Sequence, residues 1–178
     1  MSSALLYVIF MGATALERLV EVAVSKRNAA WSFARGGTEY GKGHFPAMVL
    51  LHTAFLVACP AEVWLLDRPF VPWLGFPLLI LAVAAQGLRW WCITTLGPRW
   101  NTRVIIVPDL PRVTGGPYRF IRHPNYVAVV AEGIILPMIH TAWITALAFT
   151  ILNAWLLTVR IRCEDKALSA LAAGGDHV

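Results

Sequence analysis

Residues 70–93, FVPWLGFPLLILAVAAQGLRWWCI, form an apolar run whose one charged residue is Arg89. A helix of about 20 apolar residues crosses the hydrocarbon core of a bilayer, so this run predicts a transmembrane helix. Residues 45–66 form a second apolar run, and only Asp67, Arg68 and Pro69 separate it from the first. The two runs therefore predict a helical hairpin in the membrane.

The other apolar runs extend this pattern over the whole chain. Residues 3–24, 124–139 and 141–163 predict three more spans, and the last two are joined by a turn at His140–Thr141. The run 124–139 is short for a full crossing, so we expect it to be tilted or broken at Pro137. The prediction is an all-α, polytopic integral membrane protein of about five transmembrane helices in a single domain, residues 1–178.

Composition supports lipid as the solvent of this chain. Apolar residues make up 58% and charged residues 14%, against about 25% charged in soluble domains. The pI near 9.5 could suggest nucleic acid, but the basic residues lie between apolar runs and not on one water-exposed face, so we expect no nucleic-acid partner. The three cysteines, Cys59, Cys92 and Cys163, lie in or beside apolar runs outside CxxC spacing, which favours packing.

The basic residues predict the orientation of the chain in the membrane. Twelve of the fifteen fall on one side: Lys26, Arg27, Arg35, Lys42, Arg99, Arg103, Arg112, Arg119, Arg122, Arg160, Arg162 and Lys166. The opposite side receives only Arg68, while Arg18 and Arg89 lie within spans. By the positive-inside rule, we expect the N-terminus outside and the C-terminus in the cytoplasm.

The loop at residues 94–123 carries most of the motif-like features. Val104–Val107 is too short to span and predicts a brief extended stretch, and Thr114–Pro117 (TGGP) predicts a turn. Arg119, Arg122 and His123 then precede Pro124, a favourable first residue for a helix. Helix dipole and arginines together predict an anion-attracting site, and the alternative is an anchor for lipid phosphates.

Polar residues recur at helical spacing inside the predicted spans. Asn153, Arg160 and Glu164 lie within about 20° of one line on the last helix, and Asn125 and Glu132 are seven residues apart on the fourth. Ionisable groups at membrane depth are costly and normally face the interior of the bundle. Arg160 and Glu164 end beside the basic loop, which makes them candidates for a functional site.

Other polar residues within the spans favour a structural role. The first span carries Thr14, Glu17, Glu21, Ser25 and Asn28, and the second carries His52 and Glu62. Hydrogen bonding between helices is the favoured interpretation for both sets. The five histidines lack HxxxH or HxH spacing, and the chain has no Walker loop and no GxSxG elbow, so we expect no metal site and no phosphate-binding or hydrolase site.

The order of motifs in the second half resembles a known family. GGPYRFIRHPNY (115–126), a helical hairpin and then RIRCEDKAL (160–168) resemble the isoprenylcysteine carboxyl methyltransferase family over about residues 94–168, the motif-bearing half. ERLVEVAVSKRN (17–28) and ARGGTEYG (34–41) look more like the bacterial branch encoded beside type III polyketide synthases. The paired Glu-Glu often found near the end of the family is Glu164-Asp165 here.

The resemblance implies roles for particular residues. S-adenosyl-L-methionine would lie at the cytoplasmic face, and a lipid-like substrate would enter sideways from the membrane. The implied cofactor-binding residues are Val113, Gly116, Tyr118, His123, Pro124, Tyr126 and Glu164. The implied catalytic residues are Arg122, Arg160 and Glu164, and those for substrate binding are Asn153, Glu132 and Arg160.

The functional hypothesis is O-methylation of a lipophilic acceptor in a bacterial inner membrane. The acceptor is either an isoprenylcysteine-type carboxylate or an alkylpyrone or alkylresorcinol hydroxyl supplied by a polyketide synthase. A carboxylate or acidic enol needs no strong base, whereas a phenol would use Glu164 or His123. The alternatives are a membrane reductase of the sterol-reductase type with a nicotinamide cofactor and a non-enzymatic membrane scaffold.

Overall fold

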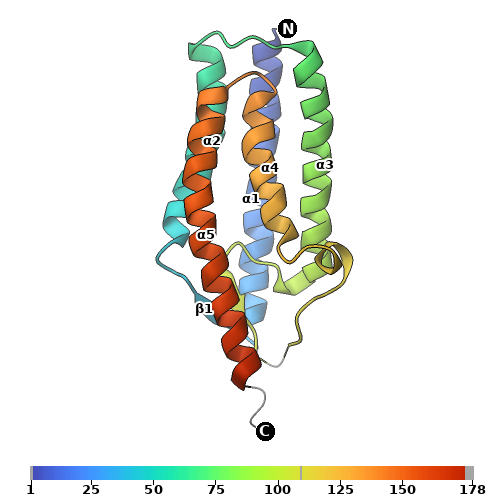
Figure 1. Cartoon of the computed structure of the whole chain (residues 1–178), viewed down its shortest axis with the longest axis vertical. Coiled ribbons are helices and arrows are strands. Elements are labelled where there is room, and N and C mark those ends of the chain that lie inside the picture. The colour runs from blue at the N-terminus through green and yellow to red at the C-terminus, as the bar shows by residue number, and fades with distance from the viewer. Residues whose placement is uncertain (1, 109, 175–178) are drawn as a thin grey trace.

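The α-helices of the described residues stand side by side in a bundle (Figure 1). The computed structural model describes residues 2–108 and 110–174, with side chains as far as Ser169. The helices are α1 (Ser3–Phe33), α2 (Phe45–Leu65), α3 (Pro72–Leu96), α4 (Pro124–Met138) and α5 (Trp143–Gly174). Two short strands, β1 (Thr38–Tyr40) and β2 (Val104–Ile106), and two 3-10 turns, η1 (Gly97–Arg99) and η2 (Gly116–Arg119), complete the described part.

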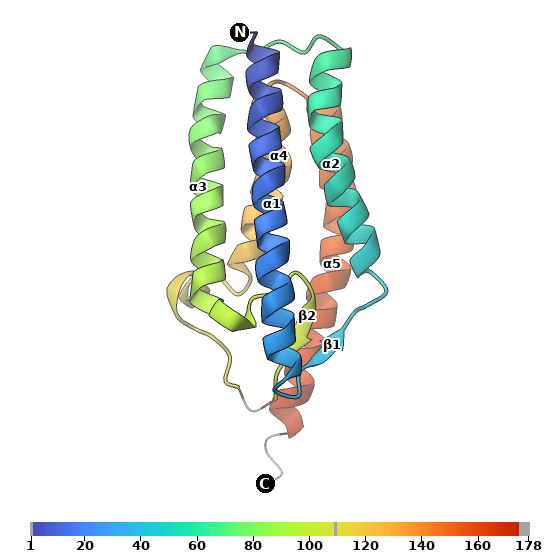
Figure 2. The same ribbon diagram turned by 180° about the vertical axis from the view of Figure 1, so that it is seen from behind.

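The two ends of the bundle differ in what they carry. The N-terminus and the short α2–α3 and α4–α5 links lie at one end, which we call the turn end (Figures 1 and 2). Residues 34–44, residues 97–123 and the last turns of α5 gather at the other, the loop end. Both predicted hairpins, α2–α3 and α4–α5, are therefore present, and the two long loops share one end.

Among the described residues, four helices are long and apolar enough to cross a membrane, namely α1, α2, α3 and α5. The fourth run expected to span forms α4, which has 15 residues. At 1.5 Å per residue it is about 22 Å long, less than the roughly 30 Å hydrocarbon core. It packs against α3 and α5, with Pro137 one residue from its end. The all-α membrane architecture is confirmed, with four spanning candidates and one shorter apolar helix.

Helices α1 and α5 continue well beyond the apolar runs that predict them, α5 as far as Gly174 and α1 as far as Phe33. The sequence places the end of the first span at residue 24, yet α1 continues to Phe33, because no Gly or Pro interrupts residues 25–33. Asn28 on these added turns donates hydrogen bonds to the carbonyls of Gly97 (3.1 Å) and Trp100 (2.8 Å). The extension of α1 thus holds the start of the loop 97–123.

The strands tie the two long loops together. β1 and β2 pair in antiparallel register, with Thr38 opposite Ile106 and Tyr40 opposite Val104. This pairing confirms the extended stretch expected at 104–107. Arg103 Nη1 also lies 3.4 Å from Glu39 Oε2, an ion pair between the two loops. The paired strands contact α5 and so hold both loops beside it.

The hydrophobic core fills the turn end of the bundle. Its buried members include Tyr7, Met11, Phe55, Cys59, Val63, Leu136 and Phe149. Cys59 and Cys92 are fully buried and Cys163 is partly buried, all three as free thiols, in agreement with a packing role. Apolar packing therefore stabilises the turn end of the bundle, and the polar loops lie at the opposite end.

Glu62 joins α2 to the first turn of α5. Its carboxylate accepts hydrogen bonds from the Thr145 backbone N–H (2.7 Å), the Thr145 hydroxyl (2.7 Å) and the Ile144 N–H (3.2 Å). Arg68 Nε donates to the same carboxylate at 3.0 Å. A carboxylate at a helix N-terminus satisfies unpaired N–H groups and complements the helix dipole. This arrangement gives Glu62 the structural role favoured from the sequence.

Glu62→Ala should lower the free energy of unfolding by about 1–3 kcal/mol, because two N–H groups and Arg68 lose their acceptor. Thermal unfolding in detergent measures this loss. Thr145→Val removes one of these donors and should cost less. An unchanged unfolding temperature for Glu62→Ala would mean that the cap adds no stability.

Candidate active site

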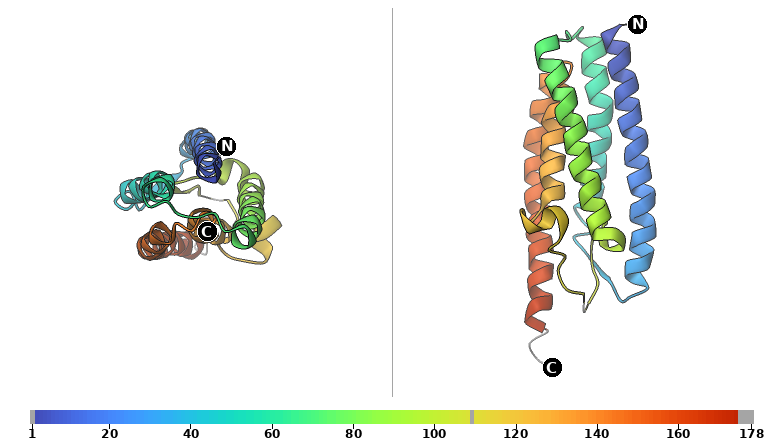
Figure 3. Two further views of the ribbon diagram at one scale, coloured as in Figure 1. Left: turned by 90° about the horizontal axis from the view of Figure 1, so that it is seen from above. Right: turned by 90° about the vertical axis from the view of Figure 1, so that its right-hand side faces the viewer.

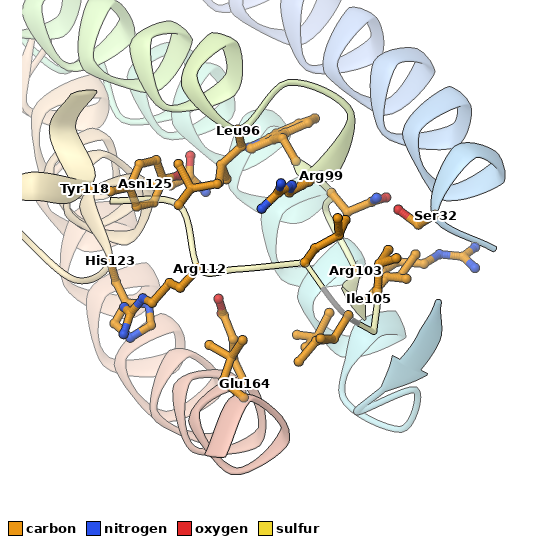
Figure 4. Close-up of a pocket in the computed structure, with 18 of the residues that line it drawn as sticks. Ser32, Leu96, Arg99, Arg103, Ile105, Arg112, Tyr118, His123, Asn125 and Glu164 are labelled. Atoms are coloured by element: carbon orange, nitrogen blue, oxygen red, sulfur yellow. The ribbon is translucent and has the colours of Figure 1, made fainter. Parts of the chain in front are cut away.

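A polar cavity of about 190 Å³ opens at the loop end of the bundle. Figure 4 shows side chains from α1, the end of α3, the loop 97–123, the start of α4 and α5 around it. The residues that line it include Ser32, Leu96, Arg99, Trp100, Asn101, Arg103, Arg112, Val113, Tyr118, Arg122, His123, Asn125, Tyr126, Arg160 and Glu164. Segments far apart in sequence therefore form one site.

Three side chains from α4 and α5 form a connected set in this cavity. The Tyr126 hydroxyl donates a hydrogen bond to Glu164 Oε2 and accepts one from Arg160 Nε at 2.9 Å. Arg160 Nη1 donates to the Thr102 carbonyl at 2.6 Å, and the guanidinium carbon lies 5.5 Å from the Tyr126 ring centroid. Arg160 is thus held from two directions, as a buried guanidinium requires.

The polar stripe of α1 supports this set from behind. Ser25 Oγ accepts a hydrogen bond from the Thr102 backbone N–H at 3.0 Å and donates to Asn101 Oδ1 at 3.0 Å. Thr102 in turn supplies the carbonyl that binds Arg160. The polar stripe predicted for the first span is therefore used in hydrogen bonds between segments, and it reaches the cavity through the loop.

His123 lies directly before α4 and stacks on Tyr126, with ring centroids 5.3 Å apart and planes 24° apart. Its Nε2 is 3.3 Å from Asp165 Oδ1, without the alignment of a hydrogen bond. The two form an ion pair when the imidazole is protonated. Asp165 therefore contacts His123, while Glu164 contacts Tyr126 inside the cavity.

Four buried polar atoms at the cavity lack hydrogen-bond partners within the described part of the chain. They are Trp100 Nε1, Asn101 Nδ2, His123 Nε2 and Asn125 Oδ1. An unpaired buried polar group costs about 1–3 kcal/mol, and native structures hold few of them. Their convergence on one cavity is the arrangement expected of a site for a polar ligand with both donors and acceptors.

The turn at η2 closes one side of the cavity. Gly116 has φ +54°, a conformation that favours glycine, and a Cβ there would lie 2.5 Å from Thr95 Oγ1. Burial raises the pKa of the Tyr118 phenol, and the neighbouring Cys92 adds to the shift, so this hydroxyl stays neutral at ordinary pH. The turn predicted at 114–117 is confirmed, and its backbone lies close against α3.

Gly116→Ala should destabilise the turn by about 1–3 kcal/mol, because it combines a strained φ with a clash against Thr95. We expect a lower unfolding temperature and weaker ligand binding, since Tyr118 on the same turn lines the cavity. Gly115→Ala is the matched control, because its φ is −83° and no atom lies within 4 Å of an added Cβ. Equal effects of the two changes would contradict this account of the turn.

Comparison with known proteins agrees with this geometry. The family model described as "Isoprenylcysteine carboxyl methyltransferase (ICMT) family" matches residues 78–170. The chain is 40% identical over 154 residues, 86% of this chain and 90% of the relative, to the uncharacterized protein YpbQ of Bacillus subtilis (strain 168). It is 28% identical over 157 residues, again 86% and 90%, to an uncharacterized protein of Haemophilus influenzae (strain ATCC 51907 / DSM 11121 / KW20 / Rd). No solved structure matches.

The chain belongs to the isoprenylcysteine carboxyl methyltransferase family. The resemblance inferred from GGPYRFIRHPNY is thereby confirmed, and the family is one of membrane methyltransferases. The family match begins inside α3 and ends inside α5, so it contains the loop 97–123, α4 and the Arg160–Tyr126–Glu164 set. Ser25, which holds Thr102, lies outside it.

Most of the residues implied by the family resemblance come together. Val113, Tyr118, Arg122, His123, Tyr126, Arg160 and Glu164 all line the cavity. Gly116 and Pro124 lie beside it, in η2 and at the first position of α4. Their roles in binding and catalysis remain predictions, and the geometry gives them a shared location.

The two other residues predicted to bind the acceptor lie elsewhere. Glu132 faces α1 and α3, where Arg18 Nη2 lies 3.1 Å from its Oε1. Asn153 is buried on α5, and its Oδ1 has no hydrogen-bond partner among the described residues. Both are seven residues from a cavity residue, Asn125 and Arg160 respectively, or about 10 Å along a helix. Their predicted role in acceptor binding is not tested by this geometry.

The sequence did not single out Trp100, Asn101 and Thr102 as site residues. They lie at the end of η1 and after it, in a loop without periodicity. Their partners on α1 and α5 are distant in sequence: 76 residues separate Ser25 from Asn101, and 58 separate Thr102 from Arg160. The one available signal is the polar Asn-Thr pair after a Trp, in a segment beside the basic motif. Such a signal indicates a loop and does not indicate which atoms face a ligand.

Proposed function

We propose that this chain is an S-adenosyl-L-methionine-dependent O-methyltransferase that acts on a lipophilic acceptor at the cytoplasmic face of a bacterial inner membrane. The acceptor carries either a carboxylate or an acidic hydroxyl of the alkylpyrone or alkylresorcinol kind. A polyketide synthase in the same cell is the proposed supplier of a hydroxyl acceptor. The N-terminus lies outside and the C-terminus in the cytoplasm, so that the loop end faces the soluble cofactor.

One observation carries this proposal. The buried Arg160 and Tyr126 and the half-buried Glu164 meet at a cavity where four further buried polar atoms make no hydrogen bond within the described chain. A lipid-phosphate anchor needs arginines at the surface and does not need unpaired indole, amide and imidazole atoms beneath it. The family match adds the expectation that the polar ligand is S-adenosyl-L-methionine.

The residues fit such a ligand in kind. Backbone groups from Val113 to Tyr118 would follow one side of it, and His123 and Tyr126 would hold its methionine part. Glu164 is an acceptor-only carboxylate and would bind its ribose hydroxyls or its amino group. Asn101 Nδ2 and Trp100 Nε1 donate no hydrogen bond within the described residues and would bind its carboxylate or ring nitrogens.

S-adenosyl-L-methionine supplies an activated methyl group on a sulfonium, so the protein mainly has to align the acceptor and exclude water. Arg160 uses Nε and Nη1 to hold Tyr126 and Thr102, and within the described residues Nη2 donates no hydrogen bond. Nη2 is therefore the group that would orient an acceptor oxygen. Arg122 lines the same cavity and would face the acceptor beside it.

The proton of the acceptor decides whether a base is needed. A carboxylate or an acidic enol arrives ionised, and the arginines would hold it without taking up a proton. A phenol would give its proton to Glu164 or His123, which flank Tyr126 in the cavity. Both groups lie at the loop end, Glu164 on α5 and His123 directly before α4, so a released proton would pass to water at that end.

Calorimetric titration of the detergent-purified protein with S-adenosylhomocysteine tests the proposal. We expect saturable binding of about one molecule per chain. A folded sample that binds no S-adenosylhomocysteine would remove the methyltransferase assignment for this chain. Titration with NADPH under the same conditions is the control, and binding of NADPH instead would support a reductase.

A further inference from the structure

A second cavity lies partway along the bundle, between the turn end and the loop end. It has a volume of about 530 Å³ and is formed by α1, α3 and α4. It is lined by Phe10, Ala13, Thr14, Glu17, Ala82, Val83, Gln86, Gly87, Trp90, Glu132 and Leu136. Figure 2 shows α1 with α3 beside it and α4 behind them, and the view from above in Figure 3 shows α1 set apart from α3. We call this cavity the lateral groove.

The rim and the upper wall of the lateral groove are apolar. Val83 is 71% exposed on the outer surface of α3, and Ala13 is exposed on α1, so the rim faces the lipid. Phe10, Ala82 and Leu136 line the wall toward the turn end. A membrane-borne hydrocarbon chain fits this part, because it exchanges one apolar contact for another.

Glu17 and Glu132 in the lower wall belong to an ionic cluster whose other members lie behind the lining, and such a cluster is unusual inside an apolar bundle. Arg18 lies 3.2 Å from Glu17, 3.0 Å from Glu21 and 3.1 Å from Glu132. Arg89 lies 2.5 Å from Glu21 and 3.6 Å from Glu132. Three carboxylates therefore share two guanidinium groups, which leaves one carboxylate in excess.

The excess is located at Glu132. Its Oε1 accepts a hydrogen bond from Arg18 at 3.1 Å, whereas its Oε2 accepts none within the described residues and is 3.6 Å from Arg89 Nη1. Glu21, by contrast, is fully buried and accepts hydrogen bonds from both arginines, and Glu17 accepts from Arg18, Gln86 and Trp90. Glu132 lines the groove, and within the described residues its Oε2 has room for a hydrogen-bond donor.

We propose that the lateral groove binds the acceptor lipid through an uncharged, hydrogen-bond-donating polar end, with Glu132 Oε2 as its partner. This inference rests on the proposed function and narrows its acceptor to a hydroxyl lipid. A carboxylate lipid is disfavoured, because it would bring a fourth negative charge to two arginines that are already occupied. A hydroxyl supplies the donor that Oε2 lacks, and the apolar wall holds its chain.

The groove is placed to deliver such a lipid to the candidate active site. Glu132 and Asn125 are seven residues apart on one face of α4, about 10 Å along the axis. Asn125 lines the polar cavity at the loop end. A lipid bound at Glu132 therefore lies about two helical turns along α4 from the polar cavity.

Three lipid probes that share the same alkyl chain and the same aromatic ring, and differ only in the polar group, test which polar end the groove prefers. We would titrate the full-length protein in detergent at pH 8 with 4-dodecylphenol, 4-dodecylanisole and 4-dodecylbenzoate, which present a donor, no donor and an anion. We expect the phenol to bind about tenfold or more tightly than the other two, as a hydrogen bond to a charged group gives. Equal affinity for phenol and anisole, or tighter binding of the benzoate, would overturn the proposal.

Variants assign the effect to the groove. Glu132→Gln should reduce the preference for phenol over anisole to about twofold or less, whereas Glu39→Gln, the same change outside the groove, should leave it unchanged. Ala13→Phe fills the groove without touching an ion pair and should weaken all three probes, so the test survives if Glu132→Gln fails to fold. A phenol preference that persists in both variants would contradict the assignment.

The groove proposal and the methyltransferase proposal can be contradicted separately. S-adenosylhomocysteine is titrated against every variant, because its cavity at the loop end shares no lining residue with the groove. If the wild-type protein binds S-adenosylhomocysteine but shows no preference for the phenol, only the groove proposal is contradicted. A wild-type protein that discriminates the lipids but does not bind S-adenosylhomocysteine would sink the methyltransferase proposal instead.

Discussion

Arg160→Ala should lower methyl transfer by about 100- to 1000-fold, the usual cost of removing one positioned cationic donor. Arg160 is buried, binds the Tyr126 hydroxyl and the Thr102 carbonyl, and has Nη2 available for the acceptor. Its loss leaves both partners unsatisfied and removes the charge that would orient the acceptor oxygen. Turnover with radiolabelled S-adenosyl-L-methionine measures the effect.

Two further substitutions separate charge from geometry. Arg160→Lys keeps the charge but cannot bind Tyr126, Thr102 and an acceptor at once, so we expect less than about a tenth of wild-type turnover. Arg162→Ala removes an exposed arginine on the same helix and should leave turnover near the wild-type value. Full activity of Arg160→Lys would show that only the charge matters there.

Glu164→Gln should weaken S-adenosylhomocysteine binding by about 10- to 100-fold, as expected for loss of hydrogen bonds to a charged group. Glu164 lines the polar cavity and accepts the hydroxyl proton of Tyr126 in a hydrogen bond. The amide keeps the size of the side chain and removes the charge, so the fold should be retained. Calorimetry gives the affinity, and thermal unfolding confirms that the protein is intact.

Asp165→Asn is the matched control for Glu164→Gln. Asp165 is the neighbouring carboxylate and contacts His123 at 3.3 Å without lining the cavity, so we expect a change in affinity of threefold or less, roughly 0.7 kcal/mol. His123→Ala should weaken binding more than Asp165→Asn, because the imidazole itself lines the cavity. Wild-type affinity in Glu164→Gln or His123→Ala would remove the cofactor role of that residue.

The difference between these neighbours has a structural cause. Glu164 reaches Tyr126 on α4, whereas Asp165, one residue further along the helix, reaches His123 before α4. In the sequence, Asp165 departs from the Glu-Glu pair of the family pattern, because its side chain is one methylene shorter. Only the packing of α5 against α4 decides which carboxylate enters the cavity.

The sequence alone determined the class of the protein. Apolar runs of about 20 residues force a helix, because backbone hydrogen bonds cannot be left open in lipid, so α1, α2, α3 and α5 follow from composition. The short connections at residues 67–69 and 140–141 determined both hairpins. The family followed from GGPYRFIRHPNY and RIRCEDKAL, since their order and spacing are specific.

The tertiary structure decided what the polar residues do. Glu17, Glu21, Ser25 and Asn28 form one stripe in sequence, yet Ser25 and Asn28 hold the active-site loop, while Glu17 and Glu21 join an ionic cluster with α3. Helical periodicity gives the face on which a residue lies and not the segment that it meets. Glu132 illustrates the limit, because its seven-residue spacing from Asn125 gives a shared face of α4, yet the two residues line different cavities.

The lengths of the helices likewise depend partly on local sequence and partly on tertiary contacts. Hydropathy identified the membrane-embedded part of α1; no Gly or Pro interrupts the nine further residues to Phe33, and Asn28 ties them to the loop end through the Gly97 and Trp100 carbonyls. Likewise α4 is too short for a crossing by length, and its contacts with α3 and α5 keep it in the bundle. Local sequence fixes which segments prefer lipid, because transfer energy is a sum over residues; long-range hydrogen bonds and packing fix where each helix ends and which side chains share a site.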